Sequence, residues 1–499
     1  MTHSPPEDGA RALLARCGAE LFTSLSGGSS HPMTQTSDPP RGNERPDPRR
    51  ERTTGRFGPD ALWVARCEVA EGWRLQPVND DPPALYTWAR PLVRLGHRPL
   101  GFAVVPLVDG SADPEEVERA VRPLLDGLDD RNGPPGASVG APSASAPSAA
   151  GERVAEADTT EVDTPEVDTT EVDTTRVFTV AICTRDRPEL AVRCLLTARE
   201  LDYPNFDILV VDNAPSDEAT RDAVEELALA DPRIHYVREP RPGLSNARNR
   251  ALHEARREYV AFTDDDVIID PWWLRGLARG FQAAPDVACV TGLVPVARLA
   301  TPEERYFDAR VSWSDRMQPA LFELDGREEP SVLFPYQAGA FGTGANFAVD
   351  REHIVSLGGF DPHLGTGSPT SGGEDLDAFV RILRSSRALA YEPSAVIWHF
   401  HRADASGLRH QMRDYGRGLA AVITKWLSQD DTRREVLRKA PAAARHLWSM
   451  WAQSATQRPV GSSRAVRFTA EEVAGALSGP VWYYRACRSD PRPSVPWRQ

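Results

Sequence analysis

Apolar runs and amphipathic stretches alternate between residues 177 and 264. Four runs have the length and the β-branched content of strands: "VFTVAIC" (177–183), "FDILVVD" (206–212), "RIHYVRE" (233–239) and "YVAFTD" (259–264). The spacing of apolar residues between them predicts a helix that begins near Pro188 and two more over about 217–230 and 244–257. Strands that alternate with helices in this way form right-handed βαβ units. We therefore expect an α/β domain with a mostly parallel sheet.

The first 128 residues divide into two parts. Residues 1–56 are rich in Pro, Ser, Gly and Arg and show little apolar periodicity, so we expect a disordered tail, with Met33 as an alternative start of translation. Residues 57–128 contain two strand-like runs, "LWVARCEV" (62–69) and "GFAVVPLV" (101–108), and a helix pattern capped by Asp113. This predicts a small α+β module, for which acceptor docking and oligomerisation are alternative roles.

Two further regions flank the α/β domain. Residues 129–176 include the acidic pentapeptides "EVDTP", "EVDTT" and "EVDTT", which are typical of a low-complexity linker. Residues 402–499 contain "GLRHQMRDYGRGLAAVITKWLSQ" and "TRREVLRKAPAAARHLWSMW", whose apolar spacing predicts a helical extension with basic residues on its other faces. We favour packing of these helices against the α/β domain, with peripheral contact to the inner face of a membrane as the alternative.

The composition of the 499-residue chain limits its function. A formal net charge of −14 disfavours a general nucleic-acid binder, because phosphate recognition depends on clustered Lys and Arg. No apolar run approaches the roughly 20 residues that span a bilayer. The N-terminus has no basic-then-apolar signal pattern, so we expect a cytoplasmic protein. The six cysteines are scattered without CxxC spacing, which is typical of reduced, buried thiols.

Three adjacent carboxylates follow the fourth strand, in "YVAFTDDDV". Side chains at i and i+2 of an extended segment share a face, so Asp264 and Asp266 could address one ligand while Asp265 points away. Mg²⁺ and Mn²⁺ prefer oxygen ligands and commonly combine one or two carboxylates with the phosphates of a substrate. The run therefore predicts a metal–diphosphate site, with an acidic turn at a strand end as the alternative.

Polar groups also end the other predicted strands, where ligands of open α/β sheets bind. "ICTRDRP" (182–188) offers the hydroxyl of Thr184 and the guanidinium of Arg185 after the first strand. Asp212 ends the second strand, and together these groups suggest a nucleotide site, although a strand-end Asp is often a helix cap. "GLSNARNRAL" (243–252) carries Arg248 near a helix N-terminus, where a pyrophosphate could bind.

A glycine-rich segment, residues 342–401, carries the remaining candidates. "GGEDLDAFVRIL" begins a helix with Glu374, Asp375 and Asp377 in its first turn, which is either ordinary capping or a second acidic site. "VIWHFH" ends an apolar strand with histidines at 399 and 401. The tryptophan before the first of them, Trp398, is predicted to be a core residue rather than a platform for a sugar.

From about residue 177 to 401 the chain resembles a family 2 glycosyltransferase of the GT-A fold. The matching pieces, in order, are "VAICTRDRP", "ILVVDNAPSD", "GLSNARNRAL", "YVAFTDDDV", "GTGANFAV", "GGFD", "GGEDLD" and "VIWHFH". The resemblance implies an inverting transferase with Mn²⁺ or Mg²⁺ as its cofactor. Such an enzyme moves a sugar from a nucleotide-diphosphate donor to a hydroxyl of a glycan, lipid-linked or small-molecule acceptor. The sugar, the nucleobase and the acceptor stay open.

The resemblance also implies roles for individual residues. The nucleotide-sugar is assigned to Thr184, Arg185, Asp212, Arg248, Asp264 and Asp265, the metal to Asp264, Asp266 and His399, and the acceptor side to Gly344, Asn346 and Glu374. Asp375 matches the catalytic base, and His401 is a less favoured alternative to His399. A carboxylate base suits the chemistry, because an acceptor hydroxyl must lose its proton as it attacks.

Two other classes of function remain as alternatives. A non-catalytic nucleotide-sugar-binding protein or partner subunit would be expected to lack the base in "GGEDLD". A nucleotidyltransferase of related topology is less favoured, because "CTRDRPEL" has no glycine-rich phosphate loop after the first strand.

Overall fold

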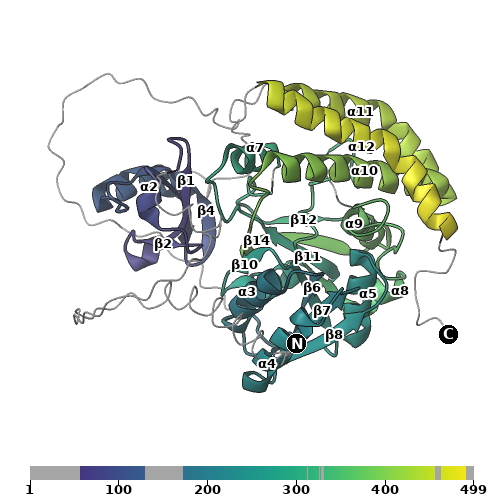
Figure 1. Cartoon of the computed structure of the whole chain (residues 1–499), viewed down its shortest axis with the longest axis horizontal. Helices are drawn as coiled ribbons and strands as arrows, with labels where there is room; N and C mark the ends of the chain where they lie inside the picture. Colours follow the sequence, from purple (N-terminus) through teal and green to yellow (C-terminus); the bar gives the residue numbers. More distant parts are fainter. Residues whose placement is uncertain are drawn as a thin grey trace, which may run out of the picture.

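The computed structural model describes residues 57–129, 172–311, 313–324, 326, 331–455 and 462–489 (Figure 1). The predicted tail over 1–56 and residues 130–171 of the predicted linker lie outside this range. Within it, a central α/β domain lies between an N-terminal module and three C-terminal helices. None of the helices in these ranges has the length and apolarity needed to cross a membrane.

The N-terminal module is a sheet of short strands covered by one helix. Its elements are β1 (Leu62–Glu68), η2 (Val69–Glu71), β2 (Leu75–Pro77), η3 (Pro83–Leu85), β3 (Trp88–Leu95), β4 (Arg98–Phe102), β5 (Val105–Pro106) and α2 (Pro114–Asp129). The strand order is β2-β1-β3-β4, and β5 also pairs with β3. Asp113 Oδ1 accepts a hydrogen bond of 3.0 Å from the backbone N–H of Glu115, which confirms the predicted cap.

The run 101–108, predicted as one strand, differs from the prediction. It contributes the end of β4 and all of β5, which pair with opposite ends of β3. Pro91 lies in β3 between these two pairings and has no N–H to donate, so only its carbonyl bonds across, to the N–H of Ala103. The break in pairing leaves Val104 exposed.

The central sheet contains nine strands in the order β10-β14-β11-β13-β9-β6-β7-β8, with β12 paired to β14. The strands are β6 (Phe178–Thr184), β7 (Phe206–Asn213), β8 (Ile234–Glu239), β9 (Tyr259–Asp264), β10 (Val267–Ile269), β11 (Val287–Leu293), β12 (Ala320–Phe322), β13 (Asn346–Asp350) and β14 (Ala388–His399). The half formed by β9, β6, β7 and β8 is parallel, as predicted. The other half is mixed, because β13 runs antiparallel to both of its neighbours.

Helices cover both faces of this sheet, which explains the uninterrupted apolar runs in the sequence. They are α3 (Pro188–Arg199), α4 (Ala219–Ala230), α5 (Leu244–Glu254), α6 (Trp273–Gln282), α8 (Arg351–Ser356) and α9 (Glu374–Arg384), whereas α7 (Pro302–Arg310) packs against the C-terminal helices. Along β7, Leu209 and Val211 enter one core cluster, and Ile208 and Val210 enter the other. All eight residues of β7 are buried, as expected for a strand with a packed layer on each side.

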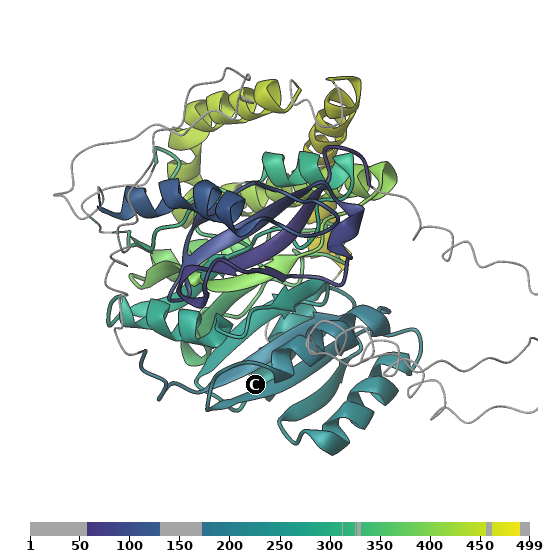
Figure 2. The ribbon, with the colours of Figure 1, turned by 90° about the vertical axis from the view of Figure 1, so that its left-hand side faces the viewer.

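The N-terminal module lies beside the central domain (Figures 1 and 2), and buried polar contacts join the two. The guanidinium of Arg94 lies 2.8 Å from the carboxylate of Asp270, and both side chains are buried. Asp270 directly follows β10. The amide of Asn79 donates to the carbonyl of Ala297, and Leu62 forms an isolated bridge with Leu299. The module therefore holds the strand that follows the aspartate run and the segment that leads to α7.

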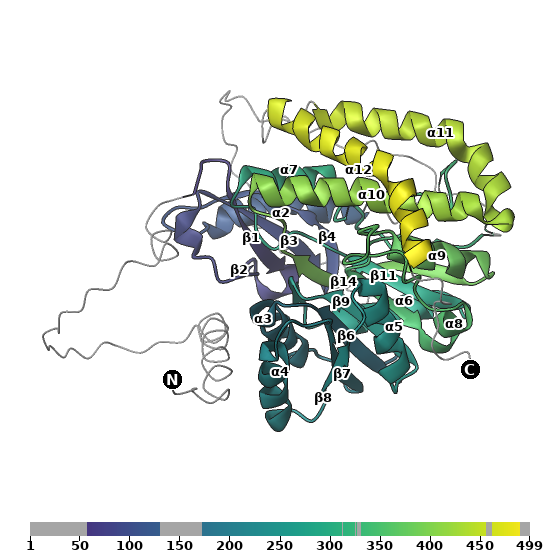
Figure 3. The same cartoon turned by 45° about the vertical axis from the view of Figure 1, so that its right-hand side comes forward.

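The C-terminal helices form a layer along one side of the central domain (Figure 3). They are α10 (Ala405–Ser428), α11 (Asp430–Ala455) and α12 (Ser462–Ser489). Lys425 of α10 lies 2.8 Å from Asp361 and 2.9 Å from Asp377, which joins α10 to the central domain. This confirms the favoured packing of the helical extension, and membrane contact stays a prediction.

Glycines allow α10 and α12 to approach closely. A Cβ at Gly416 would overlap the carbonyl oxygen of Glu472, and a Cβ at Gly475 would overlap that of Arg413. A Cβ at Gly479 would lie 2.7 Å from the carbonyl oxygen of Arg417. The backbones of the two helices are therefore in direct contact.

Replacing Gly475 with alanine tests this contact, because the expected change in the free energy of unfolding is opposite in sign to that of the same replacement in an exposed helix. In an exposed helix, Gly→Ala stabilises by about 1 kcal/mol. We expect Gly475→Ala to lower the free energy of unfolding by about 1–3 kcal/mol, because the added methyl forces α12 away from α10. Urea titration of the wild type and the variant gives the two free energies of unfolding. The exposed neighbour Ala474 is the control, since Ala474→Gly should show only the propensity cost, and a stabilised Gly475→Ala protein would contradict the close packing.

Candidate functional site

A cavity of about 990 Å³ opens at the carboxyl ends of β6 and β9. The start of α9, the loop around residues 338–345 and one face of α10 complete its wall. Ten of the predicted site residues line it: Thr184, Arg185, Arg248, Asp264, Asp265, Asp266, Gly344, Glu374, Asp375 and His399. The expectation that ligands of an open α/β sheet bind at the carboxyl ends of its strands therefore located most of the candidates correctly.

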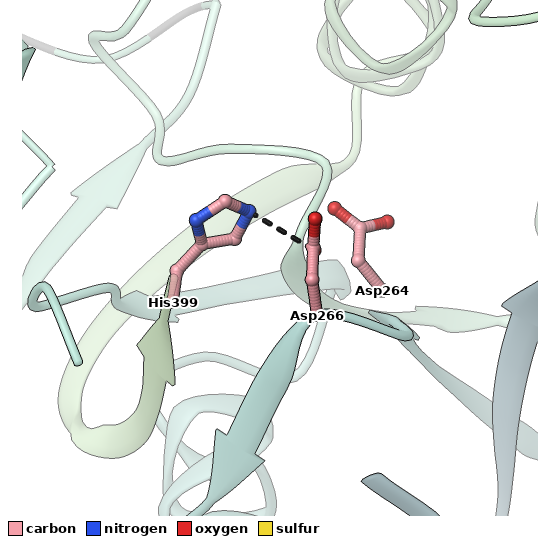
Figure 4. Close-up of side chains that lie close together, drawn as sticks. All are labelled: Asp264, Asp266 and His399. Carbon is pink, nitrogen blue, oxygen red and sulfur yellow. Dashed lines mark ion pairs between the residues drawn. The ribbon is translucent and has the colours of Figure 1, made fainter. Parts of the chain in front are cut away.

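Asp264, Asp266 and His399 form one cluster in this cavity. A ligand atom from each lies within 4.8 Å of the other two. Nε2 of His399 lies 3.3 Å from Oδ1 of Asp266 (Figure 4). β10 follows the aspartates and pairs with the end of β14, so Val267 lies opposite His399, and this pairing brings the cluster together.

The cluster has the electrostatics of a cation site. Burial and the neighbouring Asp266 raise the pKa of Asp264 to about 6. Burial also opposes the charge of Asp266, but His399 and two nearby arginines lower the pKa of Asp266. The pKa of His399 is raised, because Asp266 outweighs the effect of burial. Two carboxylate oxygens and one imidazole nitrogen at this spacing fit Mn²⁺ or Mg²⁺.

Asp265 points to different partners, as the alternation of an extended segment predicts. Its Oδ2 accepts a hydrogen bond of 2.7 Å from the hydroxyl of Thr184, and its Oδ1 accepts one of 3.0 Å from Arg187. Arg187 also lies 3.6 Å from Asp266. Asp265 therefore links the ends of β6 and β9.

Asp212 lies near the end of β7 and is fully buried, outside the lining of the cavity. Its Oδ2 accepts a hydrogen bond of 3.0 Å from the hydroxyl of Tyr236. Its Oδ1 is buried and has no hydrogen-bond partner within the described residues. Burial raises the pKa of Asp212 to about 6, against the effect of the Tyr236 hydrogen bond. The following residue, Asn213, lines the cavity together with the half-exposed Arg185.

Arg248 is a buried cation between the acidic groups. One guanidinium nitrogen donates to Oε1 of Glu374 at 2.9 Å, and the other donates to the carbonyl of Gly344 at 2.9 Å. The second nitrogen also lies 3.9 Å from Asp264. Burial and the adjacent Asp375 raise the pKa of Glu374 to about 7, although Arg248 opposes this shift. Arg248 thus joins α5, α9 and the loop before β13.

Asp375 is the acidic group on the other side of Arg248. It lies in the first turn of α9, and its Oδ2 accepts a hydrogen bond of 2.8 Å from the backbone N–H of Gly344. A Cβ at Gly344 would lie 2.8 Å from that same oxygen, so a glycine is needed for this approach. The hydrogen bond holds the carboxylate of Asp375 in place at the cavity wall.

Besides Asp212, three candidates lie away from the cavity surface. Asn346 is fully buried, and its amide bonds to the carbonyls of Leu293 and Ala395 and to the indole of Trp273. These contacts hold β13, β11, β14 and α6 together, so the structure places Asn346 in the core rather than on the acceptor side. His401 packs against Phe307, which leaves His399 as the histidine of the cluster. Trp398 is in the core, as predicted.

The structure adds cavity residues that the sequence did not indicate. Arg402 lies 3.7 Å from Asp266, and Trp313, Gln411 and Tyr415 line the wall opposite β6. Arg187 and Arg402 lie in the segments "TRDR" and "HFHR", close to the predicted site residues Thr184 and His399. Their basic side chains next to predicted site residues could have identified them from the sequence. No comparable pattern marks the residues of α10.

Comparison with known proteins identifies the central domain. Residues 179–350 match the model of Glycosyl transferase family 2, and this segment is a domain of that family. Together with the sheet order and the strand-end site, the match assigns the GT-A fold, which confirms the predicted family and fold.

Two relatives show how far the likeness extends. The chain is 28% identical over 184 residues to the pre-mycofactocin glycosyltransferase of Mycobacterium tuberculosis, which covers 37% of this chain and 35% of that protein. It is 30% identical over 220 residues to the succinoglycan biosynthesis protein ExoM of Rhizobium meliloti, which covers 43% of this chain and 64% of that protein. The likeness is therefore confined to part of each protein.

Solved structures resemble the chain more distantly. The mannosyltransferase PcManGT of Pyrobaculum calidifontis, solved with GDP-Man and Mn²⁺, has a TM-score of 0.42 and 22% identity, and the match covers 62% of this chain and 88% of that chain. Glucosyl-3-phosphoglycerate synthase of Mycobacterium tuberculosis has a TM-score of 0.35 and 17% identity, over 52% and 79% of the two chains. Because both TM-scores are below 0.5, the assignment of the GT-A fold is based on the family match and the sheet order.

Removing the charge of Arg248 should destabilise the protein even without substrate. Arg248→Met leaves Glu374 buried and unpaired, so we expect the free energy of unfolding to fall by about 3–5 kcal/mol. The double variant Arg248→Met/Glu374→Gln should regain part of that loss, because the unpaired charge is gone. Arg250, on the same helix and half-exposed, is the control, and Arg250→Met should change stability by less than about 0.5 kcal/mol. If Arg248→Met and Arg250→Met lowered the free energy of unfolding equally in denaturant titrations, the structural role of Arg248 would be contradicted.

Proposed function

We propose that the protein is an inverting, metal-dependent glycosyltransferase that uses a nucleotide-diphosphate sugar and transfers the sugar to an acceptor hydroxyl. The observation that carries the proposal is the presence of two separate acidic groups in one cavity. The first is the cluster of Asp264, Asp266 and His399, and the second is Asp375. The family of the central domain supports the same class of reaction.

The cluster would hold the metal and, through it, the donor. Asp264, Asp266 and His399 provide the ligands, and a bound Mn²⁺ or Mg²⁺ would offset the charge that develops on the leaving diphosphate. Arg187 and Arg402 lie within 4 Å of Asp266, so both guanidinium groups would also be near the charge of the leaving diphosphate. Asp265 accepts hydrogen bonds from both Thr184 and Arg187, so it would also position Arg187. Contact of Thr184 and Asp265 with the nucleotide-sugar stays a prediction.

The nucleoside would lie between Arg185 and the end of β7. Asp212 supports this position, because its unpartnered Oδ1 can accept a hydrogen bond from an N–H or O–H of the nucleoside. Asn213 and Arg185 line the cavity beside it. Arg248, which was predicted to bind the pyrophosphate directly, would instead keep the neighbouring carboxylates in place.

Asp375 would act as the general base. Its Oδ2 accepts a hydrogen bond from the N–H of Gly344 and its Oδ1 accepts one from the N–H of Leu376. Each oxygen has a second lone pair, and the cavity gives an acceptor hydroxyl access to the carboxylate. As the acceptor oxygen forms its bond to the anomeric carbon, its proton passes to Asp375. The bond from that carbon to the diphosphate oxygen breaks, and the diphosphate leaves with the electron pair. A single displacement of this kind inverts the anomeric centre.

A non-catalytic sugar-nucleotide-binding protein is the second candidate. It would keep the cluster but would not need a carboxylate held at the cavity wall. The hydrogen bond between Asp375 and Gly344 favours the enzyme. A cytoplasmic location, with or without contact between the C-terminal helices and a membrane, stays a prediction.

Donor binding tests the metal cluster. A panel of nucleotide diphosphates and nucleotide sugars is titrated into the full-length protein by calorimetry, first with Mn²⁺ and then with EDTA. We expect one donor to bind with Mn²⁺ and to lose at least about tenfold in affinity with EDTA or in Asp266→Ala, because the metal links diphosphate and protein. Asp217→Ala, an exposed carboxylate outside the cavity, is the control. Undiminished affinity in Asp266→Ala would contradict the assignment.

Turnover tests the base. We expect Asp375→Asn to bind the donor as the wild type does and to lower kcat at least about 100-fold, because an amide cannot accept the proton. Glu352→Gln, an exposed carboxylate in the first turn of α8, should leave kcat unchanged. A wild-type rate in Asp375→Asn would show that another group is the base.

A further inference from the structure

The wall of the cavity formed by α10 and the segment after α7 has no role in donor binding as described above. Its aromatic residues adjoin the metal cluster. The ring of Trp313 lies 5.7 Å from that of His399 and 6.4 Å from that of Tyr415. Tyr415 lines the cavity with 38% of its surface exposed, which is unusual for a large aromatic side chain that packs against two other rings.

Polar groups on the same face of α10 accompany these rings. Gln411 and Asp414 line the cavity one turn before Tyr415 and Gly418, which is the spacing of one helix face. Oε1 of Gln411 is buried and has no hydrogen-bond partner within the described residues. The side chain of Gln411 also hydrogen-bonds with the hydroxyl of Tyr415, so the amide and the ring form one surface at the cavity wall.

The charges on this wall disfavour an anionic ligand. Asp404, Asp414 and Glu472 contribute carboxylates to the lining. The guanidinium of Arg310 is occupied, because it lies 3.0 Å from both carboxylate oxygens of Glu472. Arg402 faces Asp266 at 3.7 Å. Arg417 lies 3.5 Å from Asp414 and donates to the hydroxyl of Ser371, so it is engaged as well. A phosphate or carboxylate placed between Asp375 and Asp414 would therefore meet carboxylates, while these guanidinium groups of the described wall already have partners.

We propose that the acceptor is an uncharged sugar unit whose ring packs on Tyr415 and Trp313 and whose hydroxyls bond to Gln411 and Asp414. A pyranose ring has an apolar face of C–H groups and a rim of hydroxyls, which suits an aromatic surface bordered by an amide and a carboxylate. In this position one hydroxyl of the acceptor is directed to Asp375, and the donor stays on the side of β6. The inference rests on the proposed function and adds the class of acceptor to it.

The test uses the full-length protein with Mn²⁺ and the donor found by calorimetry. Transfer is measured to neutral methyl glycosides and to the corresponding sugar phosphates and uronic acids, and release of sugar to water is measured without acceptor. We expect transfer to a neutral glycoside, with a KM at least about tenfold lower than for its anionic counterpart.

Variants of α10 separate recognition of the acceptor from catalysis. Tyr415→Ala and Gln411→Ala should each raise the acceptor KM about tenfold, while the Kd for the donor changes less than about twofold. Tyr415→Phe keeps the ring and should restore the KM to within about threefold of the wild type. Arg409→Ala, exposed on α10 outside the cavity, is the matched control.

Two results would overturn the inference and leave the proposed function intact. One is release of sugar to water with transfer only to anionic acceptors. The other is an acceptor KM that Tyr415→Ala and Gln411→Ala leave unchanged. A wild-type protein that neither binds a donor with metal nor releases sugar from one would instead refute the proposed function, and the class of acceptor with it.

Discussion

The site depends on one buried cation, Arg248. Five carboxylates line the cavity where β9 ends and α9 begins, and they would repel one another in a region shielded from water. Arg248 reduces this repulsion by pairing with Glu374 and lying near Asp264. Its remaining hydrogen bond to Gly344 fixes the loop that in turn holds Asp375. The proposed metal cluster and the proposed base are thus separate in the cavity but share one support.

This arrangement explains why Arg248 looked like a phosphate ligand in the sequence. An arginine near a helix N-terminus has the same local pattern whether it faces an anion in solution or a carboxylate from another element. The partner that decides between them, Glu374, lies 126 positions away in the chain. Local pattern alone cannot select between a ligand and such a distant side chain.

Other features followed from the sequence because they depend on local geometry. The helix starts at Pro188 and Pro114 reflect the fixed φ of proline at the first helical position. The parallel half of the sheet follows from the alternation of strands and helices, and the opposite directions of Asp265 and Asp266 follow from the two-residue period of a strand. The mixed half of the sheet did not follow, because the antiparallel entry of β13 between β11 and β9 is a property of chain topology. The position of Asn346 was also not predictable, because a residue of a motif near the site can be buried and bond to the core instead of lining the cavity.

The contact between α10 and α12 has a consequence for the order in which the site forms during synthesis. The strands that carry Asp212 and the aspartate run leave the ribosome well before residues 462–489, which support α10 from behind through Gly475 and join α7 through Glu472 and Arg310. The cavity wall at the ends of β6 and β9 can therefore assemble on the nascent chain while the opposite wall is still incomplete. A chain that ended before residue 462 would keep the strand ends that carry Asp212 and Asp264 and would lack the helix that supports α10.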